Sequence, residues 1–161
     1  MKRPLWLAGL SDQQKKIRVA GRGWAAGSFE PFLGGVMAAI LIVEDEAQVR
    51  VLSESYLQNQ GHETLSAANP DEALAVLASK EIDLLFTDIG LQGDLQAGLT
   101  LAQTATERRP ELRVLYTTAL PVTDGTKALF VENSAFLQKP YTIDQLQTVL
   151  TVNFGIKPHP N

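Results

Sequence analysis

The sequence predicts an α/β fold in which helices cover a parallel sheet, and three observations lead to this prediction. From Ala38 onward, short apolar runs typical of strands alternate with segments whose apolar residues recur at helical spacing. Two of the runs are almost uninterrupted, as in central strands buried on both faces. With 161 residues, the chain is long enough for one well-buried domain and too short for two ordinary domains. One domain with appendages is therefore expected.

Five strands are expected along the chain, each a short run rich in apolar or β-branched residues. They cover residues 39–43, 63–67, 84–87, 114–117 and 135–138. The first and third are the nearly unbroken apolar runs, so these two strands are expected at the centre of the sheet.

Helices are expected between the strands. In the first, Val49, Leu52 and Tyr56 recur at helical spacing and predict the buried face, and Gly61 follows as a stop signal. The second begins after Asn69, a capping residue that is followed by a proline suited to the first turn. Its buried residues are expected to be Leu74, Val76 and Leu77.

Three further helices complete the alternation. One covers about residues 98–109, and a weaker one covers about residues 124–131 with Gly125 inside it. The last covers about residues 143–152 and follows Thr142, whose side chain can cap it.

The composition is typical of a soluble globular protein, with 45% apolar and 20% charged residues. No stretch approaches the roughly 18 uninterrupted apolar residues that a membrane-spanning helix needs. The chain has no cysteine, which excludes a disulfide framework, a thiolate metal site and thiol nucleophile chemistry. A cytoplasmic protein without a membrane partner is therefore expected.

Residues 1–36 differ from the remainder in charge and pattern. They hold six Lys or Arg against two Asp or Glu, or +4, whereas residues 37–161 hold eight against sixteen, or −8. Five glycines between residues 21 and 35 break any regular element there. The segment is expected to be flexible or the product of an artefactual start upstream of Met37. The alternative is a basic arm that contacts nucleic acid or an acidic partner.

Polar residues follow four of the predicted strands, at the edge where the ligand site of an open parallel sheet lies. They are Glu44, Asp45 and Glu46 after the first strand, Asp88 after the third, Thr117 and Thr118 at the fourth, and Lys139 after the fifth. Alone, each has an ordinary interpretation as a helix start, a cap or a turn. Their joint occurrence in this fold predicts one site.

Carboxylates brought together in this way would repel one another unless a cation lay among them. With oxygen ligands only, magnesium is the expected ion. Asp88 could then act as a nucleophile toward phosphorus and form an acyl phosphate. Lys139 would supply positive charge to a second phosphoryl oxygen, and the Thr118 hydroxyl would donate to the third.

Four segments of the chain resemble the receiver domains of two-component response regulators, in the expected order and at the expected strand ends. They are Leu41-Ile42-Val43-Glu44-Asp45-Glu46, Leu84-Leu85-Phe86-Thr87-Asp88-Ile89, Val114-Leu115-Tyr116-Thr117-Thr118-Ala119 and Phe136-Leu137-Gln138-Lys139-Pro140-Tyr141. The resemblance spans about residues 38–152. It implies a flavodoxin-like, doubly wound (βα)5 fold with a five-stranded parallel sheet in the order 2-1-3-4-5.

The resemblance also implies a metal site. Asp88 is the expected phospho-acceptor, and Asp45 is the more direct acidic magnesium ligand. Glu44 would act mostly through water, and the backbone carbonyl of Gly90 would complete the site. The loop after the acceptor lacks the proline that usually precedes its glycine, so its shape is left open.

Two switch residues are implied as well. Thr118 rather than Thr117 aligns with the switch hydroxyl, because Ala119 follows it. Phe136 stands where the family carries its rotating aromatic, and it has no hydroxyl, so any switching by this ring must operate through packing alone.

The resulting domain organisation is a basic, glycine-rich extension over residues 1–37, a receiver domain over residues 38–153 and a short tail over residues 154–161. The expected function is a phosphorylation-gated interaction module of a two-component or phosphorelay system, not a turnover enzyme. The expected partners are a sensor histidine kinase or histidine phosphotransfer protein and a separate effector, because no output domain follows Asn161. A homodimer is left open, and a nucleic-acid partner is not expected.

Two other functions stay open at this point. A degenerate receiver used only for binding is disfavoured by the complete set of Asp45, Asp88, Thr118 and Lys139. A hydrolase of the haloacid-dehalogenase type would carry a second Asp two residues after the nucleophile, where this chain has Gly90.

The two histidines are not expected to take part in chemistry. His62 lies near the start of the second strand and His159 lies in the tail, and neither has a neighbour in sequence that suggests acid/base catalysis. Both are expected to face solvent.

Overall fold

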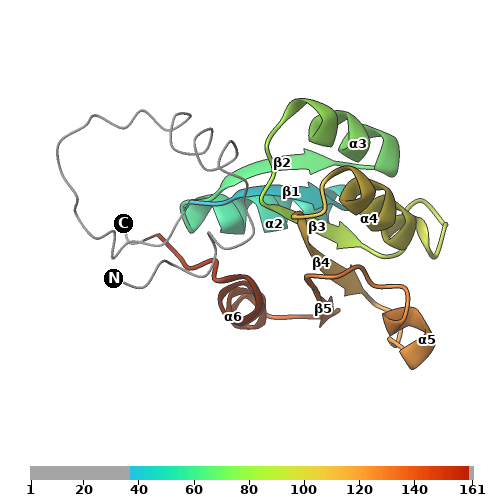
Figure 1. Cartoon of the computed structure of the whole chain (residues 1–161). Helices are drawn as coiled ribbons and strands as arrows, with labels where there is room; N and C mark the ends of the chain where they lie inside the picture. Colours follow the sequence, from blue (N-terminus) through green and yellow to red (C-terminus); the bar gives the residue numbers. More distant parts are fainter. Residues whose placement is uncertain (1–36, 160–161) are drawn as a thin grey trace, which may run out of the picture. The chain divides into compact units, whose positions relative to one another are not determined.

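The computed structural model describes residues 37–159, and in this part of the chain five parallel strands form one sheet in the order β2-β1-β3-β4-β5 (Figure 1). The strands are β1 (Ala39–Val43), β2 (Glu63–Ala67), β3 (Leu84–Asp88), β4 (Arg113–Thr118) and β5 (Ser134–Gln138). The predicted fold class and strand order are therefore confirmed. The extension expected before Met37 lies outside the described residues.

Helices follow the strands in alternation. They are α2 (Ala47–Asn59), α3 (Pro70–Ser79), α4 (Ala97–Arg108), α5 (Asp124–Lys127) and α6 (Ile143–Phe154). Two predicted caps are confirmed: Asn69 accepts a hydrogen bond from the Glu72 N–H, and Thr142 forms a reciprocal capping box with Gln145. None of the described helices is long and apolar enough to cross a membrane.

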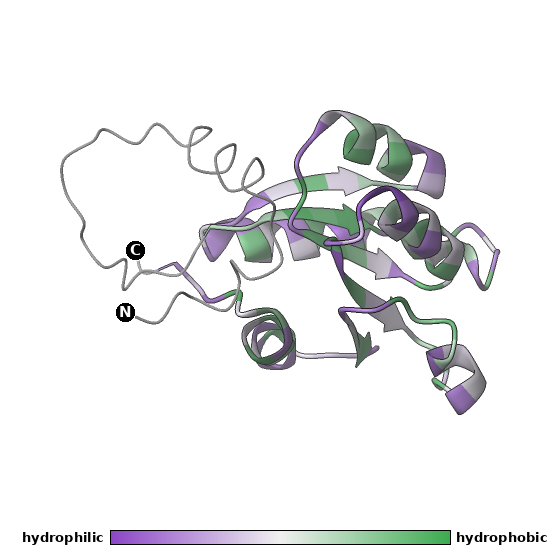
Figure 2. Cartoon of the chain, in the orientation of Figure 1, coloured by the Kyte–Doolittle hydropathy of each residue, from purple (hydrophilic) through white to green (hydrophobic). Residues whose placement is uncertain are grey.

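Side chains on the two faces of the sheet form two separate cores. On one face, Leu41 and Leu85 pack with α3 and α4. On the other, Ile40 and Leu84 pack with apolar residues of α2 and α6. Since side chains alternate between the faces of a strand, each central strand supplies both cores, which explains its continuous apolar sequence. Figure 2 shows this concentration of hydrophobic residues along the strands.

The buried face of α2 differs from the prediction. Leu52 is 71% exposed, whereas Ser53 and Leu57 are the buried residues of this helix. Val49 and Tyr56 are half-buried, as neighbours of the true buried stripe. A buried serine interrupts the apolar pattern, so the helical phase read from hydrophobicity alone is wrong at Leu52.

The helix expected over residues 124–131 is shorter than predicted and ends at Lys127. Gly125 in its first turn is about 1 kcal/mol less favourable in a helix than alanine. Beyond the helix end, the Phe130 ring stacks on Tyr116 of β4 with ring centroids 4.5 Å apart. This contact holds the segment to the sheet without further helical turns.

His62 is buried, contrary to the expectation that it faces solvent, whereas His159 is exposed as expected. The Nδ1 atom of His62 accepts a hydrogen bond from the Ala38 N–H at 3.4 Å. The C-terminal segment lies against the same turn, where the His159 N–H donates to the Gln60 carbonyl at 2.8 Å. Contacts with residues that are distant in sequence therefore bury His62. This burial, together with the charge of His159, lowers the pKa of His62.

Candidate functional site

Alternation along the strands brings two of the predicted site residues, Glu44 and Asp88, to one face of the sheet. Ile42 and Phe86 belong to the core shared with α2 and α6. Glu44 stands two positions after Ile42, and Asp88 stands two positions after Phe86. All four residues line the same pocket. Lys139 follows β5, a strand at the edge of the sheet, and its side chain donates hydrogen bonds to both carboxylates. The carboxyl edge of the sheet thus assembles a lysine and two acids.

The Lys139 ammonium joins the two carboxylates directly. Its Nζ donates to Oε2 of Glu44 and to Oδ2 of Asp88, each at 2.7 Å. The side chains of Lys139, Glu44 and Asp88 are only 20%, 7% and 14% exposed. Charges interact more strongly in such partly dry surroundings than in water, so this ammonium offsets the repulsion between the two acids.

Burial raises the pKa of the Glu44 carboxyl, and the hydrogen bond and charge of Lys139 offset that rise only in part. Burial also acts against the charged form of Lys139, but hydrogen bonds to Asp88 and Glu44 outweigh it and raise the pKa of the ammonium. A simple ion pair would lower the pKa of its acid. Glu44 departs from that rule because the effect of burial on its pKa exceeds that of the ammonium, and the charge of Asp88 adds a smaller rise.

Asp45 lies at the exposed rim of the site. Its Oδ2 accepts a hydrogen bond from the Gln92 N–H at 2.8 Å. Gln92 and Gly93 have left-handed backbone angles, φ 53° and 83°, in a turn closed by hydrogen bonds between Leu91 and Asp94. The loop after Asp88 is therefore a tight turn without proline. Within residues 37–159, no three or more His, Cys, Asp or Glu side chains are grouped as they would be around a metal ion.

Two glycines shape the backbone around Asp88. The Gly90 N–H donates to Oδ1 of Asp88 at 3.1 Å. At Gly98, at the start of α4, an added Cβ would lie 1.9 Å from the backbone oxygen of Asp88, and its N–H donates to the Ile89 carbonyl at 2.8 Å. No role was predicted for Gly98, although a glycine at the predicted start of a helix signals a close approach of this kind.

The two threonines at the end of β4 have different surroundings. Thr117 lines the pocket beside Asp88. The Thr118 hydroxyl accepts a hydrogen bond from the Leu120 N–H at 3.1 Å, in the loop after β4. Gln138 Nε2 donates to the carbonyls of Thr118 and Leu120 at 2.8 and 3.2 Å, and thus ties this loop to the end of β5. The switch role of Thr118 stays a prediction.

Phe136, the predicted switch aromatic, lies on β5 and is 37% exposed. Its ring centroid is 6.0 Å from that of Phe130, which stacks in turn on the fully buried Tyr116. The Lys127 ammonium lies 5.9 Å from the Phe136 ring centroid. A row of three aromatic rings thus connects β4 to the surface near α5, and the switch role of Phe136 also stays a prediction.

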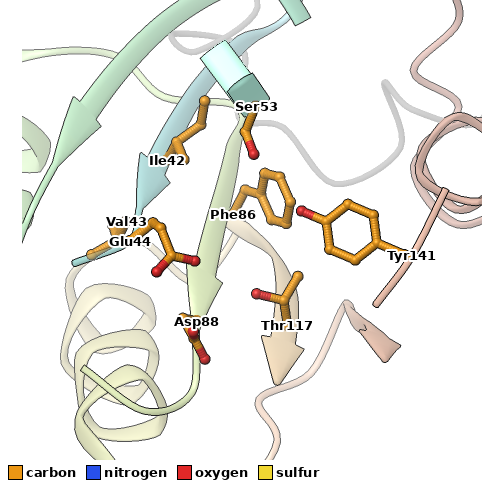
Figure 3. A pocket seen from close by; sticks show the side chains of 8 residues that line it. All are labelled: Ile42, Val43, Glu44, Ser53, Phe86, Asp88, Thr117 and Tyr141. Carbon is orange, nitrogen blue, oxygen red and sulfur yellow. The ribbon is translucent and has the colours of Figure 1, made fainter. Parts of the chain in front are cut away.

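A small pocket opens beside Asp88 (Figure 3). It is lined by Ile42, Val43, Glu44, Ser53, Phe86, Asp88, Thr117 and Tyr141. Ser53 of α2 and Tyr141, from the segment between β5 and α6, contribute the two hydroxyl groups of this lining besides that of Thr117. No role was predicted from sequence for Ser53 or Tyr141. A serine in the apolar stripe of a helix is the signal that could have identified the first of them.

A doubly wound sheet whose strand ends bring two acids and a lysine together is the arrangement of a receiver domain. The family model described as the response regulator receiver domain matches residues 40–151. The chain therefore belongs to the response regulator receiver domain family, whose members act in two-component signalling.

Curated relatives are longer proteins. The nitrogen assimilation regulatory protein NtrX of Azorhizobium caulinodans is 31% identical over 111 residues, which cover 68% of this chain and 24% of the relative. The response regulator protein PilR of Pseudomonas aeruginosa is 35% identical over 118 residues, covering 73% and 26%. The chain thus spans about a quarter of the length of the curated relatives that it matches.

Solved structures show the same fold. The chemotaxis response regulator CheY4 of Vibrio cholerae superposes with a TM-score of 0.65 at 22% identity, covering 74% of this chain and all of that one. NtrX from Brucella abortus in complex with ATP gives 0.66 at 31% identity, covering 74% and 27%. The response regulator TrrA from Thermotoga maritima in complex with Mg(2+)-BeF gives 0.63 at 27% identity, covering 73% and 100%.

Proposed function

We propose that this domain accepts a phosphoryl group on Asp88 in a magnesium-dependent reaction and thereby changes a protein-binding surface. The observation that carries the proposal is the Lys139 ammonium, 2.7 Å from both Asp88 and Glu44 at the carboxyl edge of the sheet. A fixed positive charge beside a nucleophilic carboxylate also faces the oxygens of an incoming phosphoryl group, where negative charge must be stabilised.

The oxygen donors at this edge are of the kind that a hard divalent cation prefers, although within residues 37–159 three acidic side chains are not gathered around one point. Glu44, Asp45 and Asp88 offer carboxylate oxygens from the ends of β1 and β3, and the Gly90 carbonyl offers one more oxygen close by in the chain. Two of these carboxylates already share a single ammonium, which leaves negative charge for a cation to balance. Magnesium, when bound, supplies charge neutralisation on the carboxylates and on the phosphoryl oxygens.

The described residues supply the remaining steps. An Asp88 oxygen forms the bond to phosphorus as the bond between phosphorus and the donor's imidazole nitrogen breaks. Lys139 stays protonated because its carboxylate partners raise its pKa, and it can donate to a phosphoryl oxygen. Thr118 accepts a hydrogen bond from Leu120 and still carries its own hydroxyl hydrogen, which it can donate to the phosphoryl group.

The donor is proposed to be a sensor histidine kinase or a histidine phosphotransfer protein, and a separate effector is proposed to read the phosphorylated surface. That surface comprises α5, β5 and α6. Phe136 of β5, Ile143 of α6 and Leu129, which follows α5, are exposed there. Inward movement of Thr118 would pull on the loop that Gln138 ties to β5, which couples the acceptor to this surface. A homodimer through the same surface is a second form of the proposal.

Beryllofluoride, which mimics a phosphoryl group, tests the proposal. NMR spectra of the wild type with magnesium and the mimic are expected to shift around Asp88 and Thr118, and the shifts are expected to disappear on chelation or in Asp88→Ala. A folded wild type that does not respond would instead favour a module that binds partners without phosphorylation. Multiple turnovers on a phosphomonoester would favour the hydrolase.

A further inference from the structure

The C-terminal segment after α6 crosses the turn between α2 and β2. The His159 N–H donates to the Gln60 carbonyl at 2.8 Å. A Cβ added at Gly61, whose φ is 82°, would lie 2.5 Å from the Cβ of His159, so the segment sits directly on this glycine. The next residue along the chain is the buried His62. The segment therefore covers the turn that leads into His62.

Ile156 anchors the start of this segment independently of the turn. It is 3% exposed in the core shared with α2 and α6, and its N–H donates to the Leu150 carbonyl at 3.0 Å. Its own carbonyl accepts hydrogen bonds from the side chains of Gln147 and Thr151 at 3.4 and 3.2 Å. Residues 157–159 lie beyond this anchor and have exposed side chains. They can therefore leave the turn while Ile156 stays in the core.

The surroundings of His62 do not suit a positive charge. The residue is 5% exposed, and its Nδ1 atom accepts from the Ala38 N–H, which places the proton of the neutral ring on Nε2. Within residues 37–159, Nε2 has no hydrogen-bond partner. Protonation would set an Nδ1–H against the Ala38 N–H and bury a charge that has no acceptor. The protonated ring therefore favours a change that admits water.

The titratable and charged side chains on the elements around His62 are of both signs. They are Arg50 and Glu54 of α2, Glu63 of β2, Asp83, whose carboxylate accepts from the Ala39 N–H at 2.9 Å, and Lys157 and His159 of the C-terminal segment. Burial is the larger cause that lowers the pKa of His62, and the charge of His159 adds to it. Because two imidazolium groups repel each other, protonation of both histidines also favours separation of the segment from the turn.

We propose that residues 157–159 form a pH-sensitive cover over the turn before His62, docked while His62 is neutral and released when His62 is protonated. The change is a local opening in which Ile156 and the sheet stay in place. Since the docked state lowers the pKa of His62, docking is favoured above pH 6.5 and is lost as the pH falls towards the lowered pKa. The proposal does not depend on phosphorylation of Asp88.

The experiment follows the cover by NMR in the full chain, from about pH 7.5 down to the pH at which the His62 ring is protonated. The readouts are the nuclear Overhauser effect between the Gly61 α protons and the His159 β protons, and the ¹⁵N relaxation of residues 156–159. The contact is expected to disappear, and the Lys157 and His159 amides to become mobile, as the His62 ring titrates. A contact that persists after the ring is protonated, or an Ile156 amide that becomes mobile together with them, would overturn the proposal.

Two variants distinguish the two histidines. His62→Gln keeps a side-chain acceptor but does not titrate, so the cover is expected to stay docked over the whole interval. His159→Gln removes the other imidazole, and its cover is expected to be released still, at a higher pH than in the wild type because the charge of His159 no longer lowers the pKa of His62. Release of the cover in His62→Gln, or its retention in His159→Gln, would contradict the assignment of His62 as the trigger.

Two glycine variants test whether the cover acts on His62. Gly61 and Gly93 have φ of 82° and 83°, so alanine is similarly strained at both, but a Cβ at Gly93 has nothing within 4 Å. Gly61→Ala is expected to release residues 157–159 even at neutral pH and to let the His62 ring titrate at a higher pH than in the wild type. Gly93→Ala is expected to change neither. Equal effects of the two substitutions, or an unchanged His62 titration in Gly61→Ala, would overturn the proposal.

Discussion

The Nζ atom of Lys139 lies 2.7 Å from Oδ2 of Asp88, and this contact spans 51 positions of sequence. It joins the end of β3 to the residue that follows β5, across the intervening β4. The same ammonium lies 2.7 Å from Oε2 of Glu44, so one cation supports two buried acids. The chemistry proposed for this domain depends on that arrangement.

Removal of the ammonium is predicted to slow phosphorylation strongly. Lys139→Met keeps much of the packing but removes charge-assisted hydrogen bonds, and the initial rate with acetyl phosphate is expected to fall about 10- to 100-fold. Lys127→Met is the control, because its ammonium is half-exposed and lies 4.0 Å from Asp124. A Lys139→Met rate within about twofold of the wild type would show that the ammonium is not needed.

A side chain at Gly98 is predicted to disturb the acceptor. A Cβ at this position would lie 1.9 Å from the Asp88 backbone oxygen, so Gly98→Ala must displace α4 or the end of β3. The expected loss of unfolding free energy, measured by urea denaturation, is about 1–3 kcal/mol.

Gly125→Ala is the control for Gly98→Ala. Its added Cβ would meet Thr123 Oγ1 at an ordinary 3.6 Å, and the variant is expected to gain up to about 1 kcal/mol because alanine favours a helix. Equal effects of the two alanine substitutions would contradict the close approach at Gly98.

Acidification is predicted to destabilise the domain through His62. Its pKa in the folded protein is lowered by burial from the ordinary value of 6.5, so the unfolded chain binds more protons in the interval below 6.5. The stability linked to neutral His62 is therefore fully present above pH 6.5 and is lost as the pH falls towards the lowered pKa. Protonation also removes the acceptor that Nδ1 offers to the Ala38 N–H.

The measurement is the urea unfolding free energy between about pH 7 and pH 5 for the wild type and His62→Asn. The wild type is expected to lose stability more steeply than the variant over this interval. Parallel profiles would show that another group carries the pH dependence. His159→Asn is expected to reduce the slope only slightly, because the charge of His159 is the smaller cause of the shift.

The phosphoryl group on Asp88 is predicted to be long-lived, with a half-life of minutes or more. Gly90 and Leu120, two residues after Asp88 and Thr118, offer no polar side chain to position an attacking water. The fraction of phosphoprotein is followed by intact mass after the donor is removed, and Leu120→Glu is expected to shorten the half-life. Loss of the label within seconds in the wild type would refute this prediction.

Much of the site could be predicted because its residues stand at the ends of predictable strands. Glu44 and Asp88 follow apolar runs whose parallel pairing brings their ends to one edge, and Lys139 follows a third run. A strand that is buried on both faces is a short, continuous apolar run. The residues at which such a strand ends are therefore well defined in the sequence. The distances themselves, and the sharing of one ammonium by two acids, required coordinates.

Features that depend on tertiary contacts could not be predicted. Ser53 is buried although it is polar, and it lines a pocket together with Tyr141, which lies in another part of the chain. That burial shifts the apolar stripe of α2 and leaves Leu52 exposed. His62 is covered by contacts around Ala38 and the C-terminal segment, which no local pattern reveals.

Phosphorylation of Asp88 is tested most directly by intact mass spectrometry after incubation with acetyl phosphate and magnesium. The wild type is expected to gain the mass of one phosphoryl group, to lose this gain when magnesium is chelated, and to yield a modified peptide that contains Asp88. Asp88→Asn, which keeps the shape of the side chain, is expected to gain nothing. An unmodified wild type that is folded, or equal modification of Asp88→Asn, would contradict the assignment of Asp88 as the phospho-acceptor.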